Sequence, residues 1–578
     1  MRPLLKYLKN YRLQLVLGPV FKLLEAVFEL IVPVVMADII DNGVANHDSA
    51  YIWRKTGIIV LLGVCGLGFA VTCQFLASRC AYGFGRELRD ALYRHICSLS
   101  YESVDRFGAA SLVNRLTNDT NTVQNGVNMF IRLATRSPFL VIGAAVMAVT
   151  IDLRLSVIFF IAAPLISGVI FVIMRKTVPM YKTAQQKLDR AATLTRESIE
   201  GSRVIRAFSR QGLECSVFDR SVDELTIASE SVGRISAILN PFSFLIMDCG
   251  IAAILWFGGE RIDTGSLTQG ELTAFTNYMT QILLALVVLA NLIVTFTKAF
   301  ASANRISEVF AVEPESSGTD VPGSVQPGDE ILRFNDVSFT YKGGGDCSLK
   351  NISFSLKKGG FLGIIGGTGS GKSTVAQLIP GFYEPQSGEV IYGGKDVKTL
   401  DKAMLRRRIG WVAQRAVLFS GSVRENMRFR CPDASDEDII KALKTAQAWD
   451  FVEKMPDGLD SRIAQGGRNL SGGQRQRIAI ARALVGSPEV LILDDSTSAL
   501  DYATDLRLRR ALSEELPETS VVMISQRTTS IKDADCILVL DEGSPAGVGT
   551  HDELLRDCAV YREIFNSQMN EKGGGGNG

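Results

Sequence analysis

The chain has 578 residues, of which 47% are hydrophobic and 21% are charged. This length is too great for one hydrophobic core, and the apolar content predicts two or three domains with membrane-spanning segments. Basic and acidic side chains nearly cancel to a net charge of +1, so nothing indicates a surface for nucleic acid. The ten cysteines form no C-x-x-C pair, which argues against a structural zinc site or a disulfide framework.

Six apolar segments precede residue 300, and most of them are long enough to span a bilayer. They run from Leu15 to Ile40, Gly57 to Ala77, Pro138 to Ile151, Leu155 to Met174, Ile238 to Gly258 and Phe275 to Thr297. The third segment is short, and we expect its helix to begin earlier, in the more polar stretch VNMFIRLATRS. The apolar segment after the basic N-terminus is too long for a signal-peptide core, so we interpret it as a retained membrane helix.

The two long connections, after the second and fourth segments, are rich in Arg and Lys. This bias places both connections, and with them both chain termini, on the cytoplasmic side. Apolar residues recur there at spacings of three and four, as in GRELRDALYRHICSLS, which is typical of helices. We therefore expect the membrane helices to extend well into the cytoplasm.

The composition changes to Pro, Ser, Gly and acidic residues between Val312 and Glu330, which indicates a linker. Beyond it, short β-branched runs alternate with helical stretches as in a soluble α/β domain. We thus predict an α-helical six-transmembrane-helix domain fused to a soluble α/β domain. The sequence GGTGSGKST at residues 366–374 indicates that the latter is an α/β P-loop nucleotide-binding domain. The boundaries are a membrane domain at 1–311, a linker at 312–330, a nucleotide-binding domain at 331–568 and a disordered tail at 569–578.

The strongest motif is GGTGSGKST, which matches the phosphate-loop pattern G-x-x-x-x-G-K-[ST]. It comprises Gly366, Gly367, Thr368, Gly369, Ser370, Gly371, Lys372, Ser373 and Thr374. A buried strand precedes it and a helix follows, so backbone N–H groups and a helix N-terminus can point at phosphates. Lys372 would neutralise the β and γ phosphates, Ser373 would bind Mg²⁺, and Asp494, at the end of the apolar strand VLIL, would supply a second metal-side group.

A second marker is LSGGQRQR, which contains Ser471, Gly472, Gly473 and Gln474. It can be read as an ordinary loop that opens a helix. A hydroxyl, two glycines and an amide at a helix start also form an anion-binding N-terminus, however, and one nucleotide does not need two of these. The motif therefore suggests a phosphate that is brought by a partner.

With these motifs, nearly the whole chain resembles an ATP-binding cassette (ABC) exporter half-transporter of type I. The resemblance implies that Tyr341 in VSFTYK stacks on adenine, that Gln414 in WVAQR senses Mg²⁺ and the γ phosphate, and that Asp501 in SALD contacts a second cassette. In this family two cassettes face head to tail, and each ATP lies between one phosphate loop and the other LSGGQ. Residues 107–120 and 197–208 resemble the cytoplasmic loop segments that dock on the cassettes.

Two positions depart from the hydrolytic members of the family. These members carry Glu after the Walker B aspartate, whereas this chain has Asp495, whose carboxylate is withdrawn by roughly an ångström, a displacement that can cost about a hundredfold in rate. They also carry a histidine that contacts the γ phosphate, whereas VVMISQRTT has Gln526. Glutamine can donate a hydrogen bond but cannot carry a positive charge. Together the departures predict a site that binds ATP and hydrolyses it slowly.

Four ionisable residues lie in predicted membrane segments: Lys22, Glu25, Glu29 and Asp248. Each charge costs roughly 2.5–3.5 kcal/mol at membrane depth, so these side chains should face the bundle interior or water. They are compatible with a cavity for cationic or amphipathic compounds. An internal Lys22–Glu25 pair or an interhelical hydrogen bond from Asp248 is an equally good interpretation, and the sequence does not assign their role.

The leading hypothesis is a multi-pass exporter subunit in the bacterial cell membrane, with its ATP-binding domain and both termini in the cytoplasm. It would work with a different half-transporter, complete that partner's competent site with its own LSGGQ, and move a small amphipathic substrate. Two alternatives stay open: a homodimeric exporter in which both sites carry Asp495 and Gln526, and a nucleotide-gated channel or regulatory membrane protein. The cargo is not identified by the sequence.

Overall fold

The computed structural model describes residues 2–342 and 347–573 and divides into two compact units. The first unit comprises Met1–Ser98 and Phe107–Val312, and the second comprises Leu99–Arg106 and Glu313–Gly578. The short segment of residues 99–106 therefore packs with the second unit although it lies within the sequence of the first.

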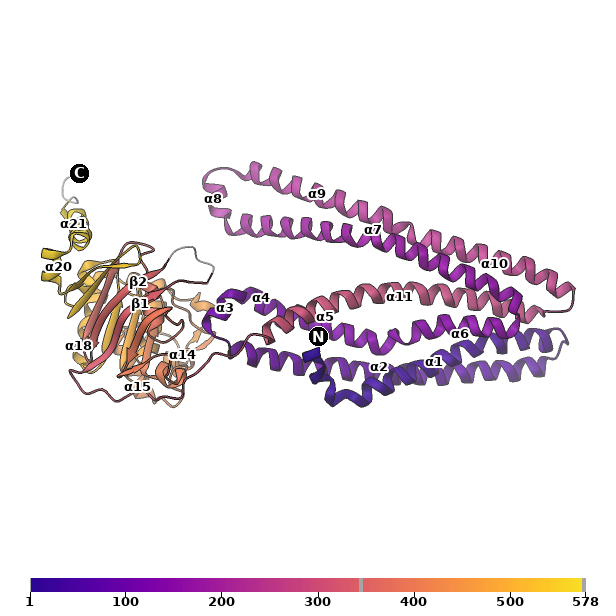
Figure 1. Ribbon diagram of the computed structural model, residues 1–578, viewed down its shortest axis with the longest axis horizontal. Coiled ribbons are helices and arrows are strands. Elements are labelled where there is room, and N and C mark those ends of the chain that lie inside the picture. Colours follow the sequence, from indigo (N-terminus) through magenta and orange to yellow (C-terminus); the bar gives the residue numbers. More distant parts are fainter. Residues whose placement is uncertain (1, 343–346, 574–578) are drawn as a thin grey trace. The chain divides into compact units, whose positions relative to one another are not determined.

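The first unit is helical in the described residues, and all six predicted apolar segments lie in its helices (Figure 1). The helices in chain order are η1 (Arg2–Tyr11), α1 (Arg12–Asp38), η2 (Ile39–Val44), α2 (Ser49–Cys97), α4 (Ala109–Asn114), η3 (Arg115–Asp119), α5 (Thr120–Met129), η4 (Phe130–Ala134), α6 (Arg136–Ile151), α7 (Leu153–Glu200), α8 (Ser202–Ala207), α9 (Gln211–Ala237), α10 (Leu239–Asp263) and α11 (Gln269–Phe310). The α2 helix has 49 residues. At 1.5 Å per residue it is roughly 74 Å long, far more than a hydrocarbon core of about 30 Å requires. The prediction that the long connections continue the membrane helices is confirmed.

In the described part of the chain, five helical stretches are long and apolar enough to cross a membrane: Ser49–Cys97, Ala109–Ile151, Leu153–Glu200, Gln211–Asp263 and Gln269–Phe310. The second stretch starts well before Pro138, so the third predicted span does begin earlier than its apolar core. The α1 helix does not reach the same apolar threshold, because its middle carries Lys22, Glu25 and Glu29.

The charges of α1 are paired within the first unit. The Lys22 ammonium lies 2.7 Å from the Glu25 carboxylate one turn away, and Arg136 at the start of α6 lies 2.6 Å from Glu29. Pairing lowers the cost of placing charges at membrane depth, so the internal-pair interpretation holds for Lys22 and Glu25. Asp248 is exposed on α10 in this single chain.

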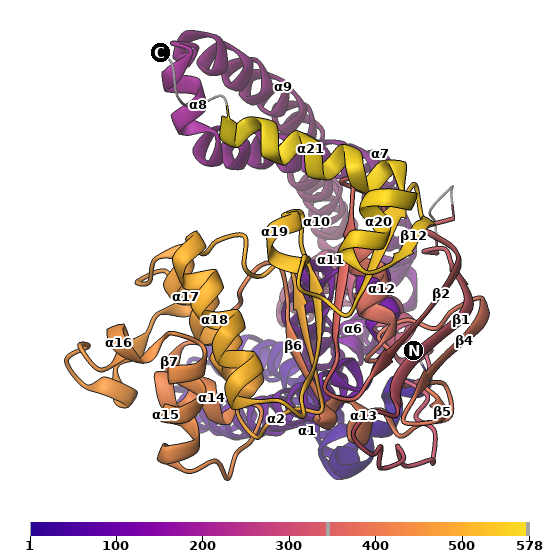
Figure 2. The same cartoon turned by 90° about the vertical axis from the view of Figure 1, so that its left-hand side faces the viewer.

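The second unit is built around two main sheets, which place the short apolar runs of the sequence in strands (Figure 2). One four-stranded sheet has the order β2-β1-β4-β5, and a six-stranded sheet has the order β12-β11-β3-β10-β9-β6. The strands are β1 (Glu330–Phe339), β2 (Leu349–Lys357), β3 (Phe361–Gly366), β4 (Ser387–Tyr392), β5 (Lys395–Asp396), β6 (Ile409–Val412), β9 (Val490–Asp494), β10 (Ser520–Ile524), β11 (Cys536–Asp541) and β12 (Ser544–Gly549), with a separate pair of β7 (Gly421–Ser422) and β8 (Arg462–Ile463).

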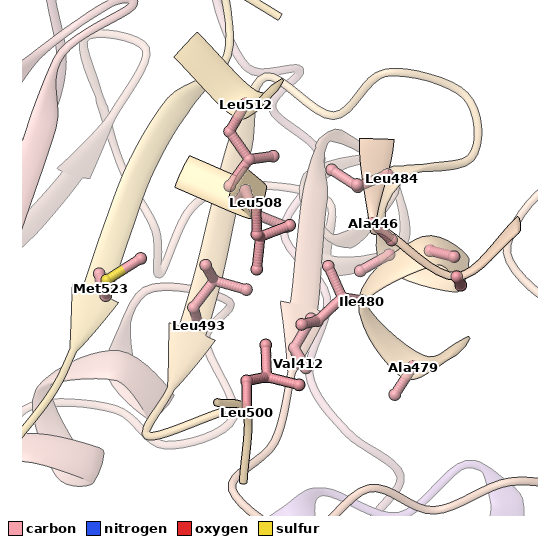
Figure 3. Packing of buried hydrophobic residues seen from close by; sticks show 14 of the residues in the cluster. Val412, Ala446, Ala479, Ile480, Leu484, Leu493, Leu500, Leu508, Leu512 and Met523 are labelled. Atoms are coloured by element: carbon pink, nitrogen blue, oxygen red, sulfur yellow. The ribbon is translucent and has the colours of Figure 1, made fainter. Parts of the chain in front are cut away.

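Within the six-stranded sheet, β3, β6, β9, β10 and β11 run parallel. The α-helices of this unit that follow β3 are α12 (Lys372–Leu378), α13 (Lys402–Arg408), α14 (Val423–Arg428), α15 (Asp436–Thr445), α16 (Trp449–Val452), α17 (Gly472–Leu484), α18 (Tyr502–Glu515), α19 (Thr528–Ile531), α20 (His551–Asp557) and α21 (Ala559–Gly573). Figure 3 shows part of the core between these helices and the sheet, where Ile480 of α17 and Leu508 of α18 are fully buried together with Leu493 of β9. The all-apolar run of β9 is explained by this burial from both faces.

The α21 helix extends to Gly573, into the segment 569–578 that we predicted to be a disordered tail. The sequence does turn to glycine there, but only at the end of the helix. Residues 574–578 lie outside the described residues.

The segment of residues 99–106, with most of α3 (Tyr101–Phe107), is held to the second unit by aromatic and polar contacts. Tyr101 stacks on Phe382 with 4.8 Å between ring centroids, and the buried Tyr383 hydroxyl donates to the Asp105 carboxylate. Burial and this carboxylate raise the pKa of Tyr383. The docked segment thus lies immediately before the stretch 107–120 that we had expected to dock.

We predict that Tyr383→Phe loosens this segment. A hydrogen bond to a charged group contributes about 1.5–3 kcal/mol, so backbone amides of residues 101–106 should exchange about ten- to a hundredfold faster in hydrogen–deuterium exchange mass spectrometry. Tyr93→Phe, at an exposed position of α2, is the matched control and should change nothing. Equal protection in Tyr383→Phe and the unmodified chain would contradict the prediction.

Candidate functional site

The carboxyl ends of four neighbouring parallel strands bring the predicted nucleotide-site residues together. The register aligns Ile524 of β10 with both Ile364 of β3 and Asp494 of β9, and Val412 of β6 with Leu493 of β9. The chain segments that leave these strands therefore emerge at one edge of the sheet, which is where open α/β sheets bind ligands. The phosphate loop, the acidic pair 494–495, Gln526 and Gln414 follow these strands.

The phosphate loop is shaped for close backbone approach. A Cβ on Gly366 would lie 2.1 Å from the Leu540 carbonyl oxygen, so only glycine fits there, whereas a Cβ on Gly367 or Gly369 would meet no atom within 4 Å. Gly369 and Gly371 have φ values of +83° and +92°, which glycine adopts without steric cost. The loop is thus open on the side where a phosphate chain would lie.

The Lys372 ammonium stands at the centre of this loop. It is almost fully buried and donates to the carbonyl oxygens of Gly366 and Gly367 and, at 3.5 Å, to the hydroxyl of Ser370. Burial lowers the pKa of Lys372, while the nearby Asp495 and Asp494 oppose this shift. A buried cation with neutral partners favours binding of an anion such as a nucleotide phosphate.

Ser373 and Asp494 form a pair suited to Mg²⁺. The Ser373 hydroxyl donates to Asp494 Oδ1 at 2.8 Å, and Asp494 is 5% exposed. Burial raises the pKa of Asp494, and the hydroxyl only partly offsets this. A hydroxyl and a carboxylate fit the oxygen preference of Mg²⁺, which keeps its remaining positions for phosphates and water. These residues would hold the ion, which would supply charge neutralisation on the β and γ phosphates.

Asp495 lies between two amide side chains. Its Oδ2 accepts from Gln414 Nε2 at 3.3 Å and from Gln526 Nε2 at 3.4 Å. Burial raises the pKa of Asp495, and the Gln414 hydrogen bond lowers it. Asp495, which follows the Walker B aspartate, and Gln526, which stands where a histidine was expected, therefore lie in contact. Neither the Gln414 amide nor the Gln526 amide can act as a base or carry a charge.

The backbone at Asp495 is held in an uncommon conformation. Its φ is +45°, in the left-handed region, and its N–H donates to the Ile524 carbonyl at 3.0 Å. Aspartate tolerates this region better than most residues, but it still costs about 1–3 kcal/mol. The turn after β9 aims the side chain of Asp495 across the ends of β10 and β6.

Tyr341 lines a pocket together with the phosphate loop. Its hydroxyl lies 3.1 Å from the Thr374 hydroxyl and donates to Gln377 Oε1 at 2.9 Å, which fixes the ring beside the phosphate loop. The pocket has a volume of about 520 Å³. Its lining residues are Tyr341, Cys347, Ser348, Gly369–Thr374, Glu542 and Gly543. An aromatic ring at one end and phosphate donors at the other match the two ends of a nucleotide.

The LSGGQ motif is not part of this pocket. Ser471 caps α17 and forms a capping box with Gln474, in which the Gln474 N–H donates to the Ser471 hydroxyl at 3.2 Å. Ser471 and Gly472 are exposed, and Figure 2 shows α17 well apart from α12. A Cβ on Gly473 would lie 3.4 Å from the Ala499 carbonyl, so the motif adjoins the loop that carries Asp501. These two motifs form a separate surface.

Comparisons with known proteins bear on both units. The model of the ABC transporter transmembrane region matches residues 15–286, and the ABC transporter model matches residues 349–498. An ABC transporter ATP-binding protein of Mycobacterium tuberculosis is 35% identical over 97% of each chain, and one of Bacillus subtilis is 35% identical over 99% of each chain. The chain belongs to the ABC transporter family.

Two further comparisons concern the exporters of this family. An ATP-dependent lipid A-core flippase of Chromobacterium violaceum is 30% identical over 99% of this chain and 97% of its own. A bacterial Atm1-family ABC exporter solved with ATP bound has 23% sequence identity, a TM-score of 0.82, and coverage of 96% of this chain and 99% of its own. This ABC transporter thus has the type I exporter fold, with a membrane domain fused to a nucleotide-binding cassette.

Three residues of the cassette site were not found by sequence reasoning. Gln377 anchors the Tyr341 hydroxyl, Tyr383 packs edge-on against the Tyr341 ring at 5.2 Å, and Gln568 bonds to the loop of Gln526. Gln377 follows the phosphate loop by one helical turn, so its spacing was a usable signal. Tyr383 and Gln568 lie in no motif and meet the site only through the fold.

We predict that Asp494→Asn stabilises the nucleotide-free protein at neutral pH. A raised folded-state pKa means that the folded state holds the proton more tightly, so the stability contributed by Asp494 falls as pH rises from the ordinary to the raised pKa. Removing the charge should raise Tm by about 2–4 °C per kcal/mol relieved, and the gain should shrink in mild acid. Mg²⁺-dependent stabilisation by ATP should be lost.

The measurement is thermal unfolding of both chains at neutral and mildly acidic pH, with and without ATP and Mg²⁺. Asp457→Asn, at an exposed position, is the matched control. A lower Tm for Asp494→Asn at neutral pH would show that the buried carboxylate stabilises the empty site.

Proposed function

We propose that this chain is one half of a heterodimeric exporter in the bacterial cell membrane. Its own phosphate loop binds ATP with Mg²⁺ and turns it over slowly, while its LSGGQ motif completes the competent site of a different half-transporter. The observation that carries the proposal is the position of Asp495 between Gln414 and Gln526 at the site where water would attack.

The chemistry of these side chains supports slow turnover at this site. The Asp495 carboxylate is one methylene shorter than glutamate and already accepts from two amides. The shorter side chain holds the carboxylate back from an attacking water, and Gln526 offers the γ phosphate a neutral donor in place of a cation. A side chain displaced by about 1 Å costs roughly a hundredfold in rate.

The exposed surface of Ser471, Gly472 and Asp501 supports a second cassette as partner. The capping box leaves the first N–H groups of α17 available to an anion, and Arg477 and Arg507 lie near Asp501. This motif is intact, whereas the chain's own site is altered. The chain is therefore better suited to completing a partner's nucleotide site than to hydrolysing ATP at its own.

A homodimer is the second candidate, and one observation favours it. Asp495 still places a carboxylate in the site, and burial raises its pKa toward the range of a usable base. Two such sites, each completed by an intact LSGGQ, would give slow but real turnover without a different partner.

We propose a small amphipathic compound as the cargo, with the second unit in the cytoplasm and the segment of residues 99–106 transmitting ATP closure. A groove of about 720 Å³ between α7 and α11 supports this cargo. It is lined by Ile170, Phe171, Met174, Val178, Leu286 and Leu289, with Arg175 as its charged member. An apolar surface with one charge suits a molecule that has both an apolar body and a polar group.

The test is ATPase activity in lipid nanodiscs of the full chain alone, with its candidate partner, and as the variant Asp495→Glu plus Gln526→His. We expect almost no ATPase activity from the chain alone and strong ATPase activity with the partner. The double variant should gain about a hundredfold in ATPase rate over the unmodified chain. Robust turnover by the purified chain alone would instead establish the homodimer.

Two matched variants separate the roles of the two surfaces in the mixed assembly. Ser471→Ala should strongly reduce turnover, because it weakens the site that holds the partner's nucleotide. Lys372→Ala should leave most of the turnover, because it affects only the slow site. Equal losses from both substitutions would contradict the proposed division of labour.

A further inference from the structure

The C-terminal helix α21 reaches the loop that carries Gln526 through a single side chain, Gln568. The Gln568 amide nitrogen donates to the Gln526 carbonyl at 2.7 Å. Its amide oxygen accepts from both the N–H and the hydroxyl of Thr528, each at 2.9 Å. Gln568 therefore holds the loop through hydrogen bonds to the residues before and after Arg527.

This attachment replaces a helix cap that the loop itself lacks. The short helix α19 begins at Thr528, which is 1% exposed, and Arg527 at its N-cap position makes no side-chain capping bond. The first N–H groups of a helix have no partner within the helix, and leaving one buried without a partner costs about 1–3 kcal/mol. Gln568, forty residues further along the chain, supplies the missing acceptor.

The other hydrogen bonds of the loop are longer than the 2.7 Å bond from Gln568. The Arg527 N–H donates to the Ser525 hydroxyl at 3.0 Å, and the Arg527 guanidinium reaches the Ser498 carbonyl at 3.5 Å. Among the described residues, the hydrogen bond of the Gln526 side chain goes to Asp495 at 3.4 Å. The loop thus depends on Gln568 for its shortest hydrogen bond to another element.

The α21 helix, which carries Gln568, is anchored near its N-terminus by a buried tyrosine. Tyr561 is fully buried, and its hydroxyl lies 2.7 Å from His551 Nδ1 at the start of α20. The His551 ring also packs edge-on against Phe565, with 5.4 Å between centroids. The anchored first turns of α21 fix the direction in which Gln568 points, so movement of the helix moves the loop.

We propose that Gln568 is a positioning residue for ATP hydrolysis, and that α21 sets where residue 526 stands relative to the nucleotide. The inference rests on ATP binding at this phosphate loop, as proposed above, but it does not depend on the identity of the second half-transporter. Residue 526 would face the γ phosphate from a loop that Gln568 of α21 holds on both sides, so loss of these hydrogen bonds lowers turnover without weakening ATP binding.

The test uses the full chain in nanodiscs and pairs each Gln568 variant with an otherwise identical parent. In the Asp495→Glu plus Gln526→His background, where position 526 carries an imidazole, Gln568→Ala should lower kcat about tenfold and leave the KM for ATP within about twofold. Gln568→Glu keeps the acceptor for Thr528 and loses the donor to residue 526, so its kcat should be intermediate. Ser567→Ala is the matched control, because the Ser567 hydroxyl donates to the Ile564 carbonyl within α21.

A second measurement needs no turnover. In the chain without other substitutions, Gln568→Ala should speed hydrogen–deuterium exchange of residues 525–531 at least tenfold, while the strands β9 and β10 keep their protection. Unchanged exchange in this segment, or a kcat equal to that of the parent or of Ser567→Ala, overturns the inference. A failure of the proposed function would appear differently, as fast ATPase by the unmodified chain, and would leave the ratio between paired variants intact.

Discussion

Parallel pairing of β3, β10, β9 and β6 is the constraint on which the functional part of this ABC transporter depends. In a parallel sheet all carboxyl ends face the same edge, so four connections that are far apart in sequence leave the sheet side by side. The buried register of Ile364, Asp494 and Ile524 then fixes the height of each side chain at that edge. A slip of one residue would turn an apolar residue toward the site and an acid toward the core.

The charged side chains of the two units differ in their hydrogen-bond partners, which are charged in α1 and neutral in the cassette. In α1 the Lys22 ammonium pairs with Glu25 and the Glu29 carboxylate pairs with Arg136, so these charges are neutralised within the chain. In the cassette the buried Lys372 and Asp494 have hydroxyl and carbonyl partners, and no ion pair joins either to another side chain in the described residues. The unbalanced charges of the cassette favour a charged ligand such as ATP with Mg²⁺.

Segments remote in sequence complete the surroundings of the nucleotide pocket. Residues 99–106 reach Tyr383, whose ring packs against Tyr341 beside the phosphate loop. The α21 helix reaches the loop of Gln526 at the phosphate end. The first contact is made by Asp105 and the Tyr101 ring and the second by Gln568. Small movements of either segment therefore change the local geometry of the site without unfolding the sheet.

The sequence by itself determined the two domains, the phosphate loop and the helix that begins at the LSGGQ motif, because periodicity, glycine spacing and charge are local properties of the chain. It also predicted that the membrane helices continue into the connections. It did not single out residues 99–106 as a segment that packs with the second unit, and it ended the last helix too early, because neither feature has a local signal. Only the tertiary structure decided that Asp495 faces two amides, that Lys22 and Glu29 are paired, and that Gln568 caps α19. These are contacts between residues distant in sequence, and packing of the whole fold, rather than any local pattern, brings them within hydrogen-bonding distance.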